Sequence, residues 1–191
     1  MLRDITDDYD QITIPQRRIA EAIGMSRSAV SRMDKENEPR YAALRGTIGN
    51  FKSEASGSDK RYSFSLPAQG GSETLHLFES AVDALSYATL LRMHGRDYQQ
   101  THLLSLAGVG STKQVPASLA RYLEDYPGIG RIDLHLDNDP AGRAATQNIS
   151  DLLGETLVVR NRSPPTGKDV NEFLCGRLGT GHQPREKYFR A

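Results

Sequence analysis

Hydrophobic residues follow two alternating spacings from about residue 73 onward. Short apolar runs rich in β-formers predict strands, and longer segments with apolar residues at helical spacing predict helices. Strands and helices in regular alternation predict an α/β fold with a parallel sheet, in which ligands bind at the carboxyl ends of the strands. The predicted strands cover 74–80, 101–109, 131–137 and 156–160, and the predicted helices cover 81–95, 115–126 and 140–154.

Residues 1–72 have a different pattern, which is polar and becomes rich in glycine and serine toward its end. Within them, residues 16–33 carry apolar residues at the spacing of a helix-turn-helix, with Gly24 at the bend. Such a motif reads DNA with its second helix, on which Arg27 and Arg32 would face the groove.

The charge balance gives the chain no general attraction to nucleic acid, because 24 Lys and Arg residues match 24 Asp and Glu residues. Any contact with DNA or RNA therefore needs a local basic patch. The single cysteine, Cys175, excludes an internal disulfide and a cysteine-based zinc site and fits a reducing cytoplasm. The acidic N-terminus and the lack of an apolar run of bilayer length favour a cytoplasmic protein without a signal peptide or membrane span.

Acidic residues follow three of the predicted strands. Glu79 ends the first strand, Asp137 ends the third with Asp139 just beyond it, and Asp169 follows the fourth. Glu79 and Asp137 extend apolar strands that helices would cover, where an unpaired carboxylate is costly. Because parallel strands converge at one edge of their sheet, we expect these carboxylates to lie together.

Part of this acidity has a purely structural explanation. Ser80 and Asp83 fit a capping box, and Asp139 followed by Pro140 fits a helix N-cap with proline at the first helical position. The acids that remain to be explained are those at the strand ends.

A divalent cation would relieve the repulsion among these carboxylates. Mg²⁺ prefers carboxylate oxygens and keeps water molecules and substrate phosphates among its ligands. A calcium-binding EF-hand loop starting at Asp137 is excluded, because Ala141 and Asn148 stand where it needs side-chain ligands, although Gly142 falls at its glycine position.

Two other patterns bear on function. The stretch GVGSTK (108–113) contains Gly-x-Gly after a predicted strand, and its backbone amides could contact a phosphate. His76 and His135 alternate with leucines, which favours places on a sheet face over a metal site.

Four segments in a fixed order carry a family resemblance: Glu79 with Asp83, then SLAGVG, LDNDPAGRAA and GKDVNEFL. Over about residues 73–175 the chain resembles the Toprim domain, in the version found in DnaG-type bacterial primases. The resemblance implies an α/β, Toprim-like (Rossmann-like) fold, with a mostly parallel four-stranded sheet flanked by helices and a small N-terminal region before it.

The resemblance also implies roles for individual residues. Glu79 matches the family's general acid or base, and Asp137 and Asp139 match the pair that binds Mg²⁺, or Mn²⁺ in its place. We also expect Lys168 to contact a substrate phosphate as a point charge.

In the primase version, further acids add a second metal position. Asp83 and Asp169 match two of them. Asn171 stands where that version has another acid, which leaves one negative charge fewer, and Ser80 replaces the glycine that usually follows the glutamate.

The segment 33–68 resembles a module that precedes Toprim domains in proteins of bacterial conjugative and other mobile elements. Its basic residues could line a groove for a nucleic-acid strand, with Tyr62 and Phe64 stacking on bases. The alternative is an ordinary solvated surface whose aromatic residues face a core. The basic candidates are Arg40, Arg45, Lys52, Lys60 and Arg61.

These patterns divide the chain into four parts. They are a helix-turn-helix-like segment (1–33), a partial module before the Toprim domain (34–72), the Toprim domain (73–178) and a C-terminal tail (179–191), with the main boundary near Gly70 and Gly71.

The function that the resemblance implies is that of a Mg²⁺-dependent Toprim protein, most like the catalytic part of a DnaG-type primase. Its partners would be DNA or RNA, nucleoside triphosphates and a helicase or relaxase of a mobile element, with no membrane contact. Two alternatives stay open. A Toprim nuclease would use the same acids to activate water, and a non-catalytic remnant would bind DNA through the helix-turn-helix alone.

Overall fold

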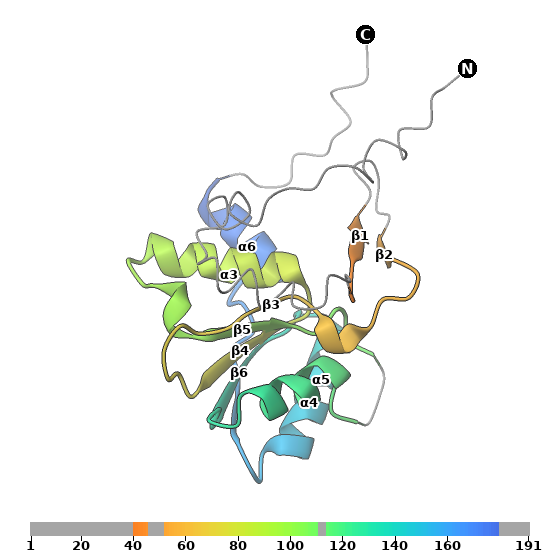
Figure 1. Cartoon of the computed structure of the whole chain (residues 1–191). Helices are drawn as coiled ribbons and strands as arrows, with labels where there is room; N and C mark the ends of the chain where they lie inside the picture. Colours follow the sequence, from red (N-terminus) through yellow and green to blue (C-terminus); the bar gives the residue numbers. More distant parts are fainter. Residues whose placement is uncertain (1–39, 46–51, 111–113, 180–191) are drawn as a thin grey trace, which may run out of the picture. The chain divides into compact units, whose positions relative to one another are not determined.

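The computed structural model describes residues 40–45, 52–110 and 114–179, and all of them except Arg40 belong to one unit, Tyr41–Ala191. The expected helix-turn-helix, with Arg27 and Arg32, lies outside the described residues. A five-stranded sheet with the strand order β3-β5-β4-β6-β7 forms the centre of the described part (Figure 1).

Four strands of this sheet are parallel, as the sequence predicts. They are β4 (Thr74–Phe78), β5 (His102–Ser105), β6 (Arg131–His135) and β7 (Val158–Asn161). β4 is central, because it pairs with β5 on one side and with β6 on the other, while β7 pairs with β6. The mostly parallel α/β fold is therefore confirmed.

A fifth strand comes from upstream of the expected boundary near Gly70 and Gly71. β3 (Ser65–Leu66) pairs antiparallel with β5 at the edge of the sheet. Just before it, the short 3₁₀ helix η1 (Lys60–Tyr62) packs against α4 (Ala117–Asp125). The four-stranded sheet expected from the sequence thus gains an antiparallel strand from the segment before it.

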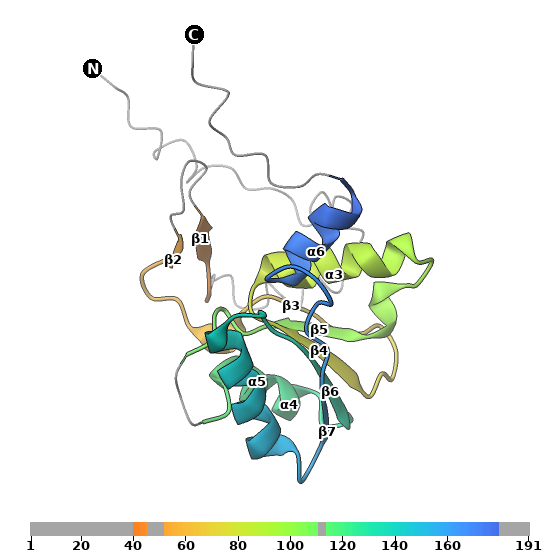
Figure 2. The same cartoon turned by 180° about the vertical axis from the view of Figure 1, so that it is seen from behind.

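Helices cover both faces of the sheet. α3 (Ala81–Met93) and α6 (Val170–Arg177) lie on one face, and α4 and α5 (Pro140–Leu153) lie on the other (Figures 1 and 2). The sequence predicts α3, α4 and α5, whereas α6 follows from the structure alone. The remaining elements are the 3₁₀ helix η2 (Tyr98–Gln100) and a separate antiparallel pair, β1 (Ala43–Arg45) with β2 (Lys52–Glu54).

Strand residues alternate between two separate cores. Leu75 and Leu77 of β4 pack toward α4 and α5, whereas Phe78 packs toward α3 and α6. The side chains of β4 and β6 that face α3 include His76 and His135, which are both buried.

The two buried histidines form a hydrogen-bonded pair. His76 Nδ1 lies 2.9 Å from His135 Nε2, and both rings pack against Tyr87 of α3. Burial lowers the pKa of His76 to about 4 and the pKa of His135 to about 3, because desolvation disfavours the charged ring. Both rings are therefore neutral at physiological pH, and their expected place on a sheet face is confirmed.

Helix α5 approaches the end of β6 so closely that only glycine fits at position 142. A Cβ atom on Gly142 would lie 2.2 Å from the carbonyl oxygen of Asp137. That distance is far shorter than any van der Waals contact, so α5 can start where it does only because residue 142 has no side chain.

We predict that Gly142→Ala destabilises the protein by about 1–3 kcal/mol, because the added methyl group forces α5 away from the end of β6. Urea unfolding followed by circular dichroism measures the change. Gly176→Ala is the matched control, because Gly176 also lies in a helix and nothing lies within 4 Å of its Cβ position. Equal stability of the two variants would contradict the tight approach.

Candidate functional site

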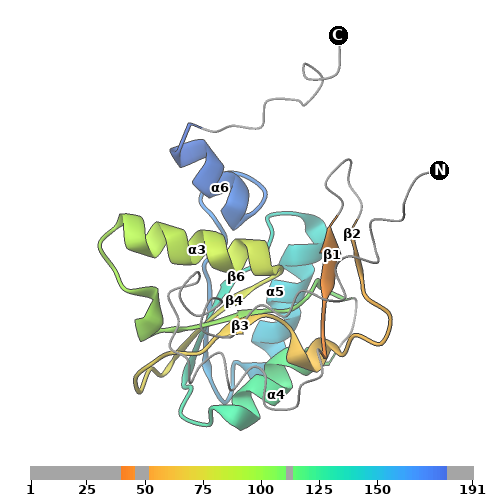
Figure 3. The same cartoon turned by 45° about the horizontal axis from the view of Figure 1, so that its top comes forward.

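Carboxylates from two neighbouring strands meet at one edge of the sheet. In the parallel pairing of β4 with β6, Phe78 lies opposite His135, so both strands end at the same level. Glu79 follows β4, and Asp137 follows β6 after one more apolar residue. Helices α3 and α5 begin at this edge on opposite faces of the sheet (Figure 3). Glu79 and Asp137 therefore follow strand ends at the same level of the sheet, as expected from the sequence.

Glu79 lies half-buried without a partner for one of its oxygens. Its Oε2 atom is buried and has no hydrogen bond within the described part of the chain. Burial and the neighbouring charges of Asp137 and Asp139 raise the pKa of Glu79 to about 7. This carboxyl group is therefore poised to exchange a proton near neutral pH.

Lys168 bridges the two aspartates. Its Nζ atom lies 2.9 Å from Asp137 Oδ2 and 3.3 Å from Asp139 Oδ2. Asp137 is only 5% exposed, and its burial raises its pKa despite the nearby ammonium group. The same two carboxylates raise the pKa of Lys168, so the ammonium stays charged and offsets part of their repulsion.

Asp139 has a second role as the N-cap of α5. Its Oδ1 atom accepts a hydrogen bond from the backbone N–H of Gly142 at 2.9 Å. This hydrogen bond is the main reason why the pKa of Asp139 is lowered. The cap expected from the Asp-Pro sequence is confirmed, and it leaves Asp139 Oδ2 facing Lys168.

Asn138 holds the loop that carries Lys168. Its side-chain Nδ2 donates hydrogen bonds to the carbonyl oxygens of Pro164 and Gly167, both at 2.9 Å. Its backbone N–H donates to the carbonyl oxygen of Lys168 at 2.7 Å. An amide with two N–H donors is needed here, which explains why Asn138 stands between two acids. Sequence reasoning missed this role, because the partners lie far along the chain.

Asp83 connects α3 to α6. Its Oδ2 accepts from the Ser80 hydroxyl at 2.5 Å, and its Oδ1 accepts from the backbone N–H of Asn171 at 3.2 Å. The hydroxyl of Ser86 donates to the side-chain oxygen of Asn171. Both oxygens of Asp83 therefore have partners in the protein, and Ser80 caps α3 as expected. A metal-binding role for Asp83 stays a prediction.

Asp169 is the N-cap of α6. It accepts a hydrogen bond from the backbone N–H of Glu172 at 2.7 Å, and Glu172 in turn accepts from the backbone N–H of Lys168. Asp169 contributes to the raised pKa of Asp83, so the two carboxylates lie close enough to interact. Its role as a metal ligand also stays a prediction.

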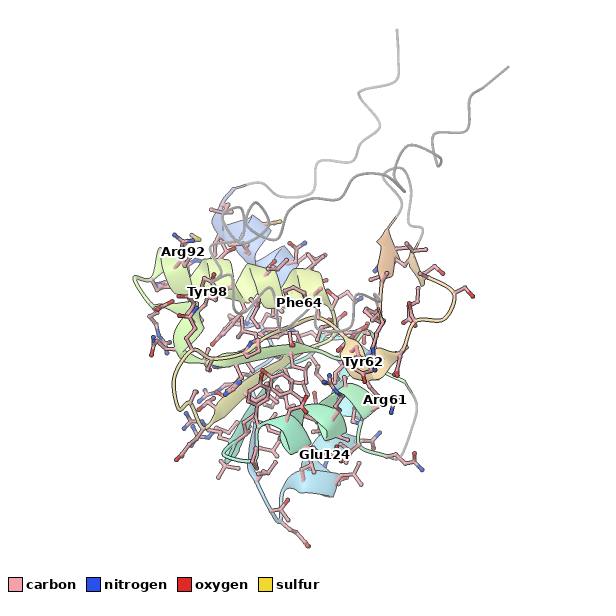
Figure 4. The ribbon with its side chains drawn as sticks, in the orientation of Figure 1. Arg61, Tyr62, Phe64, Arg92, Tyr98 and Glu124 are labelled. Atoms are coloured by element: carbon pink, nitrogen blue, oxygen red, sulfur yellow. The ribbon has the colours of Figure 1, made fainter. Side chains whose placement is uncertain are left out.

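Two of the upstream basic candidates form ion pairs within the protein. Arg61 forms an ion pair with Asp59 at 2.6 Å, and Lys60 forms one with Glu54 at 2.9 Å. Arg45 lies at the end of β1. Figure 4 shows Arg61 and Tyr62 together at η1, and the guanidinium of Arg121 from α4 lies 4.2 Å from the centre of the Tyr62 ring.

Phe64 does not match the base-stacking expectation. It packs against the core between the sheet and α3 and so takes the alternative role of a core aromatic (Figure 4). Binding of nucleic acid by the basic residues of this segment stays a prediction.

Glu79, Asp137 and Asp139, at the carboxyl ends of β4 and β6, form what we call the acidic edge. Its chemistry suits a hard divalent cation. All its donors are carboxylate oxygens, and Glu79 Oε2 is a buried oxygen without a partner in the described part. A cation already sits between Asp137 and Asp139, namely the Lys168 ammonium. In the arrangement described, no three His, Cys, Asp or Glu side chains within the described ranges converge on one point. The Lys168 side chain that occupies this place is half-exposed.

We predict that Asn138→Ala loosens the loop between β7 and α6, because the carbonyl oxygens of Pro164 and Gly167 lose their shared donor. The expected loss of stability is about 1–2 kcal/mol. Hydrogen exchange of residues 162–169 should become faster, as measured by mass spectrometry.

The control for this substitution is Gln147→Ala, which removes an exposed amide on α5 that donates a hydrogen bond to Asp151. Unchanged exchange across 162–169 in Asn138→Ala would show that Asn138 does not hold the loop.

None of the helices in the described ranges has the combined length and hydrophobicity that crossing a membrane requires.

Comparisons with known proteins identify relatives of the chain. It is 28% identical over 200 residues to the uncharacterized protein pXO2-78 of Bacillus anthracis, covering 97% of this chain and 53% of that protein. The chain thus spans about half the length of the curated relative that it matches.

Among solved structures, the primase fragment of the bacteriophage T7 primase-helicase protein is similar over 76% of this chain and 55% of that one. The sequence identity is 18% and the TM-score is 0.49. At this level the likeness carries no argument about function.

A family model described as Toprim-like matches residues 76–174, from within β4 to within α6, and so includes the acids that follow β4 and β6. This match spans more than half of the 191 residues and agrees with the order of motifs and with the strand ends that carry the acids. The chain belongs to the Toprim-like family.

Proposed function

We propose that this protein binds Mg²⁺, or Mn²⁺, at the acidic edge and joins nucleotides on a nucleic-acid template, as a DnaG-type primase does. The observation that carries the proposal is that Glu79 and Asp137 follow two adjacent parallel strands that end at the same level. Together with Asp139 they lie close enough for their charges to raise the pKa of Glu79, and one oxygen of Glu79 is buried and unpaired in the described part. Folding alone gives no reason for this arrangement, because burying a carboxylate without a partner costs free energy.

Each residue of the acidic edge would have a separate role in the reaction. Asp137 and Asp139 would hold the metal, which when bound neutralises a triphosphate and lowers the pKa of an attacking 3′-hydroxyl. Glu79, whose pKa is raised to about 7, would accept the proton of that hydroxyl.

Lys168 would have a different partner in each state. Its ammonium lies between the aspartates in this structure, and when these hold a metal it would contact a substrate phosphate as a point charge. Asn138 would keep the Lys168 backbone in place during this change, through its hydrogen bonds to the loop. Asp83 and Asp169 would support a second metal position.

The partners in this proposal follow from the chemistry and the family. They are DNA or RNA as template and nucleoside triphosphates as substrates, with a helicase or relaxase of a mobile element that delivers the strand. Arg45, Lys60 and Arg61, and Arg27 and Arg32 in the segment outside the described residues, are the candidates for contacts with the strand. The cytoplasm is the compartment where these substrates occur.

The test begins with metal binding. Calorimetric titration of Mg²⁺ and Mn²⁺ into the wild type should show binding at millimolar concentration or below, and the double variant Asp137→Asn/Asp139→Asn should bind at least about tenfold more weakly. Asparagine retains the helix cap at position 139 while removing the charge, so the result reports on metal binding and not on folding. Asp151→Asn, an exposed acid on α5, is the control.

Activity assays with the same proteins then distinguish the reactions. Incorporation of labelled nucleoside triphosphates on single-stranded DNA, lost in the double variant, supports the primase-like function. Metal-dependent cleavage of DNA without incorporation would instead identify a nuclease. A wild type that binds neither metal at millimolar concentration would overturn the proposal and leave a binding protein.

A further inference from the structure

The loop that follows β5 turns across the end of β4, directly beside Glu79. The N–H of Leu106 donates to the carbonyl oxygen of Phe78 at 2.8 Å. The N–H of Gly108 donates to the carbonyl oxygen of Glu79 at 2.9 Å. Between these two hydrogen bonds the loop advances from 106 to 108, while β4 advances only from 78 to 79. Ala107 is therefore an extra residue, as in a β-bulge, and bulges beside functional sites redirect a neighbouring residue.

Ala107 has an unusual backbone conformation. Its φ is 56°, in the left-handed region, and no other non-glycine residue in the described ranges has a positive φ. A residue with a side chain adopts this region at a cost in free energy and keeps it only when its surroundings hold it there. The contacts of Ala107 therefore identify the groups that hold the loop in its bend.

Both polar groups of the Ala107 backbone have partners. Its N–H donates to the hydroxyl oxygen of Ser105 at 3.1 Å, and its carbonyl oxygen accepts from the Nζ atom of Lys60 at 3.0 Å. Ser105 is buried at the end of β5, whereas Lys60 lies upstream of the residues 76–174 that match the family model. The bend thus depends on one residue of the Toprim-like domain and on one lysine from the segment before it.

A single peptide group connects Lys60 to the backbone of Glu79. The C=O of this group, from Ala107, accepts from the Lys60 ammonium, and its N–H, from Gly108, donates to the carbonyl oxygen of Glu79. A hydrogen bond to the C=O of a peptide also strengthens its N–H as a donor, because the two bonds polarise one another. Lys60 therefore acts on Glu79 through one peptide group.

The segment that carries Lys60 is itself held in place. The Lys60 ammonium forms an ion pair with Glu54 at 2.9 Å. Just after η1, the Ser63 hydroxyl donates to the carbonyl oxygen of Ser105, and the N–H of Ser105 donates to the carbonyl oxygen of Phe64 at 2.9 Å. Lys60 is thus presented to the loop by a segment that is bound along the end of β5.

We propose that Lys60 is a positioning residue for Glu79, because it orients the peptide group between Ala107 and Gly108 that fixes the Glu79 backbone. This inference rests on the proposed role of Glu79 in the reaction. It differs from the strand contact proposed for the same lysine, because positioning of Glu79 affects the chemical step and a strand contact affects binding of the template.

The experiment uses two substitutions of Lys60 and one control. Lys60→Met removes the ammonium and keeps an unbranched side chain, whereas Lys60→Arg keeps the charge and the donors. Arg121→Met is the matched control, because it removes the same charge from α4 beside η1. The guanidinium of Arg121 pairs with Asp125 at 3.1 Å and lies over the ring of Tyr62.

Two measurements by NMR test the connection without any need for activity. In Lys60→Met, the amide proton of Gly108 should exchange with solvent at least about tenfold faster than in the wild type. The ¹³C signal of the Glu79 carboxyl group, assigned with Glu79→Gln, should shift. Lys60→Arg and Arg121→Met should resemble the wild type in both measurements.

Global stability should change little in these variants. The Lys60 side chain is half-exposed, so Lys60→Met should lower the midpoint of thermal unfolding by no more than about 2 °C. A change at Gly108 and Glu79 without a loss of folding then reports on the local connection.

Steady-state kinetics of nucleotide incorporation separate the two roles of Lys60. Positioning predicts that kcat falls by about tenfold in Lys60→Met, with the KM for the template unchanged and with recovery in Lys60→Arg. A raised KM with an unchanged kcat would overturn the positioning role and leave a contact with the strand.

Unchanged amide exchange at Gly108 together with an unchanged Glu79 signal in Lys60→Met would overturn the proposal, whatever the kinetics show. Equal changes in Arg121→Met would also overturn it, because they would indicate a general effect of charge. A wild type that incorporates no nucleotide would count against the proposed function alone, since the NMR measurements still decide whether Lys60 holds Glu79.

Discussion

The parallel pairing of β4 with β6 is the constraint on which the candidate site depends. Because the two strands end at the same level, Glu79 and Asp137 emerge at one edge although they are far apart in the sequence. The cost of placing these carboxylates together is met partly by Lys168 and partly by a raised pKa at Glu79. A protein that lacked a use for these charges would have little physical reason to retain them buried.

Residues of the LDNDPAG segment make different contacts that together fix the local structure. Asp137 and Asp139 face Lys168, Asn138 holds the loop behind that lysine, and Asp139 also caps α5. Gly142 lets the first turn of α5 lie against the backbone of Asp137. The helix, the strand end and the loop are thereby fixed to one another over a few residues, and the acids acquire a defined geometry.

The elements and helix caps that were predicted correctly depend on local sequence patterns. Apolar runs and helical spacing located the four parallel strands and α3, α4 and α5, and short polar patterns located the caps at Ser80 and Asp139. The missed features depend on long-range contacts. β3 is a two-residue strand defined only by its pairing with β5, and the role of Asn138 depends on carbonyl groups far along the chain.

The central claim is that the acidic edge exchanges the Lys168 ammonium for a divalent cation. Anomalous diffraction from crystals soaked in Mn²⁺ tests it most directly, because the metal and the lysine are seen in the same map. The account predicts a peak bound by Asp137 and Asp139, with the Lys168 side chain turned away from both. Absence of a peak at saturating Mn²⁺, with Lys168 still between the two aspartates, would contradict it.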